Sequence, residues 1–516
     1  MKPTRAVGWI FALSFLATTS TGFADRDDED DTAAEMVAPA PMAPSPMRMK
    51  ASGSMGATPG GAQDIDYARD RINAGEIPHP NTFTAEGLLS QHDLPLNTGT
   101  RCTQILCLTG AATRAELLAQ PEVRHLAQLG FASNLDPKKW RREPLNLVAV
   151  VDQSGSMSGQ PLETVKASLR HIALQMNRDD EMAIVLYGDA SHVHLLPTSL
   201  RHRQRVLASI DAIQSSGSTN MEEGLRTGYD TAFSRVKQFR GKTRVMLFTD
   251  ERPNVGRTDK DSFMGMARDA SQQGVGLTTI GVGTHFGAEL ATKISSVRGG
   301  NLFFFPDVAS MQKRFTKDFD VMVTELAYDL RLKVRPAKDF ELVGLYGLPG
   351  DLVKRTTDGG VEMTVETIFL SKEKGGIFFA FKPKGGGALP PSDSTVGFAD
   401  LSYLDTSRQR RHDAVAFKEW RGQSLPLGLA RGRLLVDEIT VLKKASDLHR
   451  IQNKTEEAYR LVRALGQRFD QSPVSSLGEE RALIAKMDQT LTRLSGHQGE
   501  SGSSPARRDP VTGLPQ

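Results

Sequence analysis

The sequence predicts an α/β protein with a doubly wound, mostly parallel sheet, joined to a β-sandwich-like domain and a C-terminal helical region. Three observations predict this fold class. Short apolar strands alternate with amphipathic helices from Leu145 onward, the apolar period switches to two after Val323, and helical spacing returns after Pro426. At 516 residues the chain is long enough for several domains.

The α/β region opens with the continuous apolar run Leu147–Val151, which is typical of a strand buried on both faces. Strands separated by helices of this length predict a parallel sheet with helices on both faces. Further strands are expected at Met182–Tyr187, His192–Leu196, Thr243–Thr249, Gly276–Ile280 and Asn301–Phe305. Helices are expected around residues 162–176 and at Gln204–Ile213, Met221–Val236, Phe263–Gln272, Glu289–Val297 and Ala309–Leu326.

In the second half of the chain, the sequence predicts strands first and helices after them. Gly- and Pro-rich turns separate the strands, as in a β-sandwich. These strands are expected at Tyr328–Arg335, Phe340–Leu345, Val361–Leu370, Gly376–Lys382, Val396–Leu404 and Asp413–Lys418. Three helices are expected at Leu429–Lys444, Lys454–Leu465 and Glu479–Leu494.

The first residues resemble a secretory signal. Lys2 and Arg5 precede the apolar run Ala6–Ala17, and small residues favour cleavage after Ala24. We therefore expect a periplasmic or secreted protein without a membrane span after signal removal; an uncleaved anchor is the alternative. The predicted domains are a signal peptide (1–24), a disordered acidic and then Ala/Pro/Met/Gly-rich linker (25–63), an N-terminal accessory segment (64–144), the α/β domain (145–322), a β-rich domain (323–420), a helical region (421–494) and a disordered tail (495–516).

Charge and cysteine content narrow the function. The 64 basic and 61 acidic side chains leave a formal net charge of only +3, which does not favour nucleic-acid binding. The two cysteines, Cys102 and Cys107, are expected either to form a disulfide in an oxidising compartment or to remain as two reduced thiols.

Three loops of the α/β domain carry oxygen ligands. Asp152, Ser154 and Ser156 follow the first strand, Thr219 precedes a helix, and Asp250 ends a later strand. Ligands of open parallel sheets bind beyond the carboxyl ends of the strands, so these side chains should meet. Two carboxylates and three hydroxyls suit a hard divalent cation, with Mg²⁺ expected first and Mn²⁺ or Ca²⁺ as alternatives. Such a cation would keep an open position for the Asp or Glu of a protein partner.

At these residues the chain resembles the von Willebrand factor type A (vWA) family and its metal-ion-dependent adhesion site. All five positions match, and the resemblance extends to Gly276–Gly283 and covers Leu145–Phe319, about a third of the chain. It implies a Rossmann-like fold in which both serines, and often the threonine, coordinate directly, while the aspartates act directly or through water. Glu251 stands where the family often has glycine. A looser similarity over Tyr67–Leu94 resembles the accessory segment of bacterial exported vWA proteins.

We therefore expect an exported, metal-dependent protein-binding protein of the adhesion or assembly type. One alternative is a vWA scaffold for an envelope or ion-transport assembly, and another is a hydrolase. The sequence contains no nucleophile elbow, no His-Glu-x-x-His motif and no phosphate-binding Gly-x4-Gly-Lys loop. We accordingly expect a protein that is not an enzyme; its oligomeric state is not predicted.

Overall fold

The computed structural model describes ten stretches of the chain. They are residues 56–58, 65–99, 101–136, 138–251, 261–282, 299–305, 308–348, 353–371, 375–386 and 394–497. The predicted signal peptide, most of the linker, the helix expected at Glu289–Val297 and most of the tail lie outside these residues.

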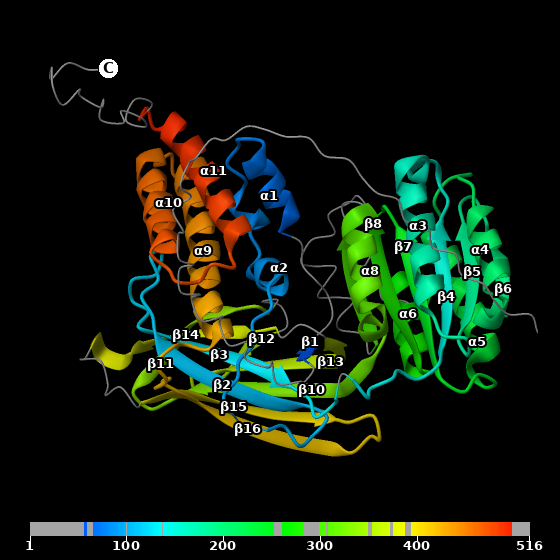
Figure 1. Cartoon of the computed structure of the whole chain (residues 1–516), viewed down its shortest axis with the longest axis horizontal. Helices are drawn as coiled ribbons and strands as arrows, with labels where there is room; N and C mark the ends of the chain where they lie inside the picture. Colours follow the sequence, from blue (N-terminus) through cyan, green and yellow to red (C-terminus); the bar gives the residue numbers. More distant parts are fainter. Residues whose placement is uncertain are drawn as a thin grey trace, which may run out of the picture. The chain divides into compact units, whose positions relative to one another are not determined.

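A six-stranded sheet in the order β6-β5-β4-β7-β8-β9 forms the centre of the α/β domain (Figure 1). Only the β5–β6 pair is antiparallel. The strands are β4 (Leu145–Asp152), β5 (Glu181–Tyr187), β6 (Ser191–Ser199), β7 (Lys242–Thr249), β8 (Val275–Val282) and β9 (Gly300–Phe305). The helices of this domain are α3 (Gln160–Gln175), α4 (Arg203–Asp211), α5 (Met221–Val236), α6 (Phe263–Gln272) and α8 (Val308–Met322).

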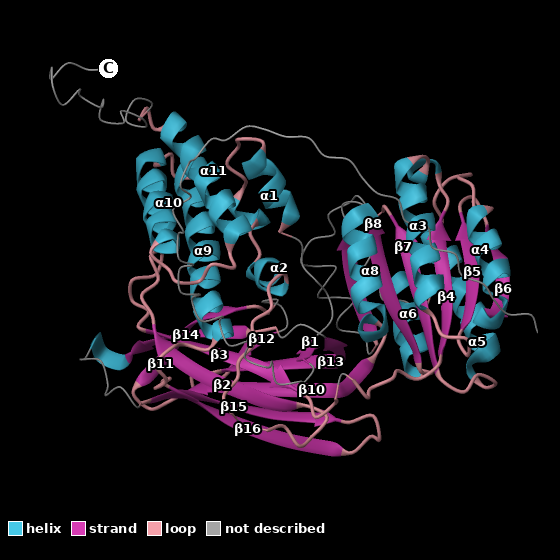
Figure 2. Ribbon diagram, viewed as in Figure 1, coloured by secondary structure: helices cyan, strands magenta, loops and turns pink. Residues whose placement is uncertain are grey.

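Strand β4 is buried along its whole length because each face of the sheet carries its own core. Leu147, Ala149 and Val151 pack with residues of α3, α4 and α8. Val148 and Val150 pack with residues of α5 and α6 on the other face. Figure 2 shows the strands of this domain between helices. The predicted doubly wound, mostly parallel sheet is confirmed.

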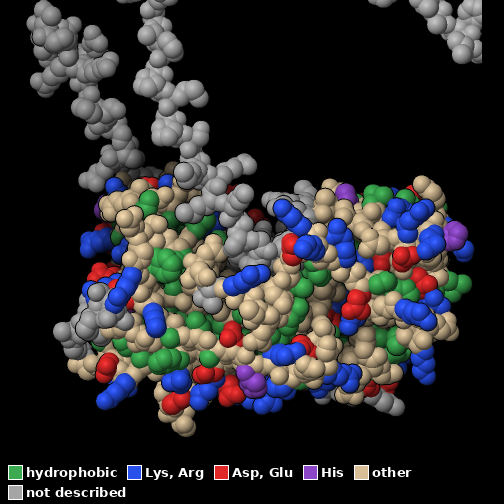
Figure 3. All heavy atoms as spheres, turned by 60° about the horizontal axis from the view of Figure 1, so that its bottom comes forward, with side chains coloured by type: hydrophobic (Ala, Val, Ile, Leu, Met, Phe, Trp, Pro, Cys, Tyr) green, Lys and Arg blue, Asp and Glu red, His purple; other side chains and the backbone are tan. Residues whose placement is uncertain are grey.

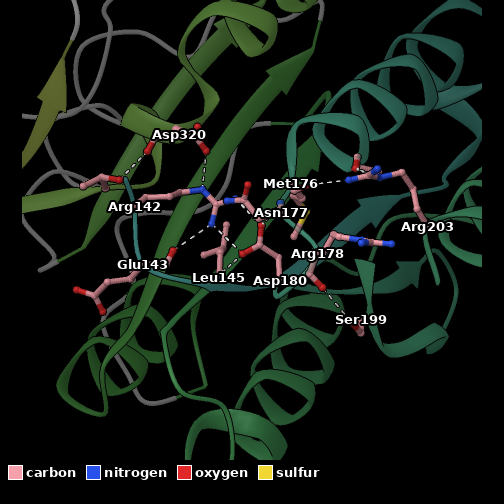
Figure 4. Close-up of polar contacts among 12 residues, drawn as sticks. Arg142, Glu143, Leu145, Met176, Asn177, Arg178, Asp180, Ser199, Arg203 and Asp320 are labelled. Carbon is pink, nitrogen blue, oxygen red and sulfur yellow. Dashed lines mark hydrogen bonds and ion pairs between the residues drawn. The ribbon is translucent and has the colours of Figure 1, made fainter. Parts of the chain in front are cut away.

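A buried arginine anchors the end of this domain where β4 begins (Figure 4). Arg142 forms a two-pronged ion pair with the fully buried Asp180, which also accepts a hydrogen bond from Leu145 N at 2.8 Å. Arg142 Nε donates to Asp320 of α8 at 2.5 Å. The two ends of the α/β domain therefore lie next to each other.

Two antiparallel sheets form the β-domain. One has the order β11-β14-β3-β2; the other has the order β1-β13-β10-β15-β16, with β12 also on β13. The strands are β1 (Gly56–Thr58), β2 (Cys107–Arg114), β3 (His125–Ala132), β10 (Glu325–Pro336), β11 (Phe340–Tyr346), β12 (Val353–Arg355), β13 (Val361–Ser371), β14 (Ile377–Pro383), β15 (Thr395–Leu404) and β16 (Arg410–Lys418). Because β3 pairs with β14, residues before and after the α/β domain share one sheet.

Two features of the β-domain differ from or extend the sequence analysis. Strand β1 lies within the range predicted to be disordered, and it pairs antiparallel with β13. Strands β2 and β3 fall in the segment for which no strand was predicted. Cys102 and Cys107 form a disulfide at the start of β2, which settles the alternative left open by their spacing.

Five helices pack on the outer face of the four-stranded sheet. One core joins them to residues of β2, β3 and β14, among them Ala111, Leu126 and Phe378. The helices are α1 (Asp66–Asn73), α2 (Ala85–Ser90), α9 (Leu427–Arg450), α10 (Thr455–Asp470) and α11 (Gly478–Leu494). Short 3-10 turns occur at Pro80–Thr82, Gly155–Met157, Leu200–His202 and Lys384–Gly386.

The surface matches the near-balance of charge in the sequence. On the face drawn in Figure 3, Lys and Arg side chains are interspersed with Asp and Glu. This face therefore has no single-sign field of the kind that nucleic-acid binding requires. Among the described helices, none is both long and apolar enough to cross a membrane.

Candidate metal site

Asp152 is the last residue of β4, and its carboxylate is fixed by three donors. Ser154 N donates to Oδ1 at 2.9 Å, while the hydroxyls of Tyr187 and Thr249 each donate to Oδ2 at 3.1 Å. Asp152, Tyr187 and Thr249 are all fully buried. The carboxylate therefore has one orientation, set by the ends of β4, β5 and β7.

Three further predicted residues form a chain of oxygens beside this carboxylate. Ser154 Oγ lies 3.0 Å from Ser156 Oγ, and Ser156 Oγ donates to Asp250 Oδ1 at 3.2 Å. Ser154 is buried, whereas Ser156 is exposed and Asp250 is half-buried. The oxygens thus lead from the interior to the surface at the carboxyl end of the sheet.

The loop that carries Thr219 lies against the loop of the two serines. Gly155 N donates to Gly217 O at 3.1 Å, and Ser216 N donates to Gln153 O at 2.6 Å. Gly217 has a φ of +82°, and a Cβ there would lie 2.7 Å from Asp189 N, so both backbone conformation and space call for glycine. Thr219 follows this turn and is partly buried. Its loop is thus placed at the site, although the side-chain contacts described above join only Ser154, Ser156 and Asp250, and Asp152 is linked to them through the backbone N of Ser154.

Burial and neighbouring charge raise two pKa values at the site. Burial raises the pKa of Asp250, and the Asp152 carboxylate adds to this, while the hydrogen bond from Ser156 opposes it. Burial also raises the pKa of Tyr187 well above its usual value, with Asp152 adding to the effect. Tyr187 therefore keeps its proton and remains a donor. The packing of two carboxyls with hydroxyls but without a basic side chain among these residues fits a site for a cation.

Tyr187 and Thr249 hold the Asp152 carboxylate, and neither was predicted to belong to the candidate site. Thr249 directly precedes the predicted ligand Asp250, and Tyr187 ends the strand predicted at Met182–Tyr187. In the parallel pairing of β4 with β5, Asp152 lies opposite Tyr187. This pairing could not be predicted, because the sequence motif at the end of one strand does not show which residue of the neighbouring strand lies opposite.

Comparison with known proteins agrees with this fold. Residues 146–317 match the profile of the von Willebrand factor type A domain. The α/β domain of this chain therefore has the vWA fold, and the additional antiparallel sheets and C-terminal helices described above lie outside the matched segment. The matched segment contains all five predicted ligand positions.

Several relatives share part of this chain. It is 29% identical over 285 residues to the uncharacterized protein YfbK of Escherichia coli (strain K12), a match that covers 52% of this chain and 48% of that protein. It is 28% identical over 149 residues to human inter-alpha-trypsin inhibitor heavy chain H3, covering 28% of this chain and 17% of that protein. The chain thus spans about half, or less, of the length of these relatives.

Solved structures with similar folds include two of note. A von Willebrand factor type A protein from Catenulispora acidiphila aligns with a TM-score of 0.42 and 13% identity, covering 76% of this chain and 98% of that one. Proximal thread matrix protein 1 from the mussel byssus, whose metal-ion-dependent adhesion site is occupied by zinc, aligns with a TM-score of 0.27 and 19% identity over 34% of this chain and 44% of that one.

Proposed function

We propose that this chain is an exported protein that binds a protein partner through a divalent cation, with Mg²⁺ as the preferred ion. Asp152, Ser154, Ser156, Thr219 and Asp250 would hold the cation, and an Asp or Glu of the partner would complete its coordination. The observation that carries the proposal is the convergence of four of these side chains from two separate strand ends. When bound, the cation supplies a positive charge and a coordination position for the partner's carboxylate.

The spacing of the oxygens supports a small cation. Octahedral Mg²⁺, with metal–oxygen distances of about 2.0–2.1 Å, places neighbouring ligand oxygens about 2.9 Å apart, whereas Ca²⁺ ligands at about 2.3–2.6 Å would lie further apart. The Ser154–Ser156 and Ser156–Asp250 oxygen pairs are separated by 3.0 and 3.2 Å. These side chains would need little movement to coordinate Mg²⁺.

The exposure of Ser156 supports binding of a partner. Asp152 and Ser154 close the inner side of the site, because both are buried. Ser156 is exposed, so the outer side faces solvent. A carboxylate can approach only from that side, and the loops around residues 153–158 and 216–220 would contact the segment that presents it. Export is inferred from the signal-like residues at positions 1–24, and the proposal includes no catalytic step.

Calorimetric titration with Mg²⁺, Mn²⁺ and Ca²⁺ tests the site. The wild type should bind one cation, and Asp152→Asn and Ser156→Ala should each lose at least about 100-fold in affinity, because changes to groups that only orient metal ligands already cost about 10–100-fold. Ser158→Ala is the matched control, since Ser158 is exposed in the same loop but outside the motif. Equal affinities in all four proteins would exclude this site.

The partner is tested by capture on the immobilised wild type from an envelope extract, with and without EDTA. A partner of the proposed kind should be retained only with the cation and should be lost with Ser156→Ala but not with Ser158→Ala. Replacing the partner's exposed Asp and Glu residues singly should then identify one carboxylate that is required. Retention that is insensitive to EDTA would contradict a metal bridge.

A further inference from the structure

Tyr187 occupies an unusual place behind the candidate metal site. Its hydroxyl, like that of Thr249, donates to Oδ2 of Asp152, at 3.1 Å in each case. Its ring lies so close to α5 that a Cβ on Gly224 would approach the Cγ and Cδ1 atoms to 2.5 Å. The glycine lets the helix close over the ring, so the packing of α5 helps to hold the hydroxyl at Asp152.

Burial of the ring does not by itself explain why the Tyr187 hydroxyl donates to Asp152. Tyr229, on α5, is also buried, yet its hydroxyl has no hydrogen-bond partner among the described residues. The same domain therefore contains one buried tyrosine whose hydroxyl is directed at a metal-site carboxylate and one whose hydroxyl is not used. The ring supplies apolar packing in both cases, and only Tyr187 adds a specific polar contact.

The two hydroxyls limit how Asp152 can coordinate a cation. A carboxylate oxygen has two lone-pair positions, and both positions of Oδ2 are taken by Tyr187 and Thr249. Oδ1 already accepts from Ser154 N and has one position left. Asp152 can therefore offer a single oxygen, either to the cation or to a water bound to it.

This restriction discriminates between cations. Ca²⁺ takes about six to eight oxygens and often binds a carboxylate through both of its oxygens, whereas Mg²⁺ takes six ligands in a tight octahedron and keeps several waters. Building on the proposed metal site, we propose that Tyr187 is a positioning residue that sets cation specificity: it occupies Oδ2 of Asp152 and so prevents two-oxygen coordination, which favours Mg²⁺ over Ca²⁺.

The test compares Tyr187→Phe with Tyr229→Phe, each of which removes one buried tyrosine hydroxyl. Calorimetric titration of the full chain with Mg²⁺ and with Ca²⁺ gives the affinity ratio. In Tyr187→Phe, Mg²⁺ affinity should fall about tenfold, as expected for loss of an orienting hydrogen bond, and Ca²⁺ affinity should fall less or rise. The ratio should therefore drop at least about fivefold, whereas Tyr229→Phe should keep the wild-type ratio.

Thr249→Val removes the other donor to Oδ2 with little change in shape, and the ratio should shift in the same direction. Thermal unfolding without added metal separates specificity from folding, because a purely structural role would lower the midpoint without changing the ratio. An unchanged ratio in both Tyr187→Phe and Thr249→Val, with a wild type that binds cation, would overturn this inference alone. A wild type that binds no cation would overturn it together with the proposed function.

Discussion

Glu438 and Glu480 are two buried carboxyls whose pKa values are moved in opposite directions. Burial, and then the nearby negative charge of Glu480, raise the pKa of Glu438 well above its usual value, and no described donor reaches either of its oxygens. Burial would also raise the pKa of Glu480, but the hydrogen bond from His92 and the charge of Arg69 outweigh it and lower this pKa to about 2. Arg69 and His92 lie 2.6 and 2.9 Å from Glu480 Oε1.

The directions of these two pKa shifts determine how the free energy of unfolding depends on pH. Above about pH 4.5 the unfolded chain ionises Glu438 while the folded chain keeps it protonated, so the free energy of unfolding falls as the pH rises until the folded pKa is reached. The contribution of Glu480 has the opposite sense: it is present above about pH 4.5 and is lost as the pH falls towards 2. Glu438→Gln removes only the loss of stability with rising pH, and leaves the contribution of Glu480 in place.

We expect Glu438→Gln to be more stable than the wild type at pH 8, with a smaller difference at pH 5. Urea unfolding at several pH values, with Glu479→Gln as a control on an exposed neighbour, measures this difference. A difference between Glu438→Gln and the wild type that does not change with pH would show that Glu438 is ionised in the folded protein.

At the residue scale, the sequence names the candidate metal ligands but not the residues that hold them in place. The five metal positions follow a motif whose spacing is fixed along the chain, so they could be named directly. Tyr187 and Glu438 could not, because their roles depend on partners that only the packed structure brings close. For Tyr187 this is the register of β4 against β5, and for Glu438 it is the contact of α9 with α11.

Among the elements, the α/β alternation was predictable, whereas the short strands β1 and β12 and the longer strands β2 and β3 were not. The buried parallel strands appear as apolar runs, and the helices between them keep a period near 3.6. By contrast, β2 and β3 are buried on both faces, between the sandwich core and the helices, and they contain Gly, Ala and Thr. Their sequences therefore show neither the alternation of a half-exposed strand nor a strongly apolar run.

The packing of α9 on the four-stranded sheet depends on one glycine. A Cβ on Gly432 would overlap the ring of Phe378, which is fully buried in β14. Gly432→Ala should therefore destabilise the protein by about 1–3 kcal/mol through overpacking. Urea unfolding of this variant tests the prediction.

Gly466 of α10 is the matched control for Gly432. Its nearest neighbour to an added Cβ is Ile484 Cγ2 at 3.8 Å, which is ordinary contact. Gly466→Ala should accordingly stabilise the protein by about 0.5–1 kcal/mol, because alanine loses less backbone entropy in a helix. The same sign for both substitutions would contradict the proposed close packing of α9 on β14.

At the scale of the whole molecule, the vWA domain is inserted into the β-domain. Strand β3 precedes it in the sequence, β14 follows it, and the two pair antiparallel. The two cores of the vWA domain contain only residues from Leu145 to Val323. The contact of Arg142 with Asp320 brings the ends of the domain together. An inserted unit with its own cores and adjacent ends should be separable from the rest.

We therefore expect that replacing residues 142–322 with about six Gly and Ser residues, which span about 13 Å on average, leaves the β-domain and the helices folded. The excised segment 142–322 should fold separately and bind Mg²⁺ as the full chain does. In contrast, deleting Cys107–Ala132 from the full chain should unfold the β-domain, because β14 loses β3, one of its two partner strands, and exposes the fully buried Phe378 and Phe379. Circular dichroism with thermal unfolding, and calorimetry for the cation, measure these outcomes. Loss of the β-domain in the first chain would mean that the two domains fold as one cooperative unit. Survival of the β-domain after the Cys107–Ala132 deletion would mean that β14 does not need β3 as a partner.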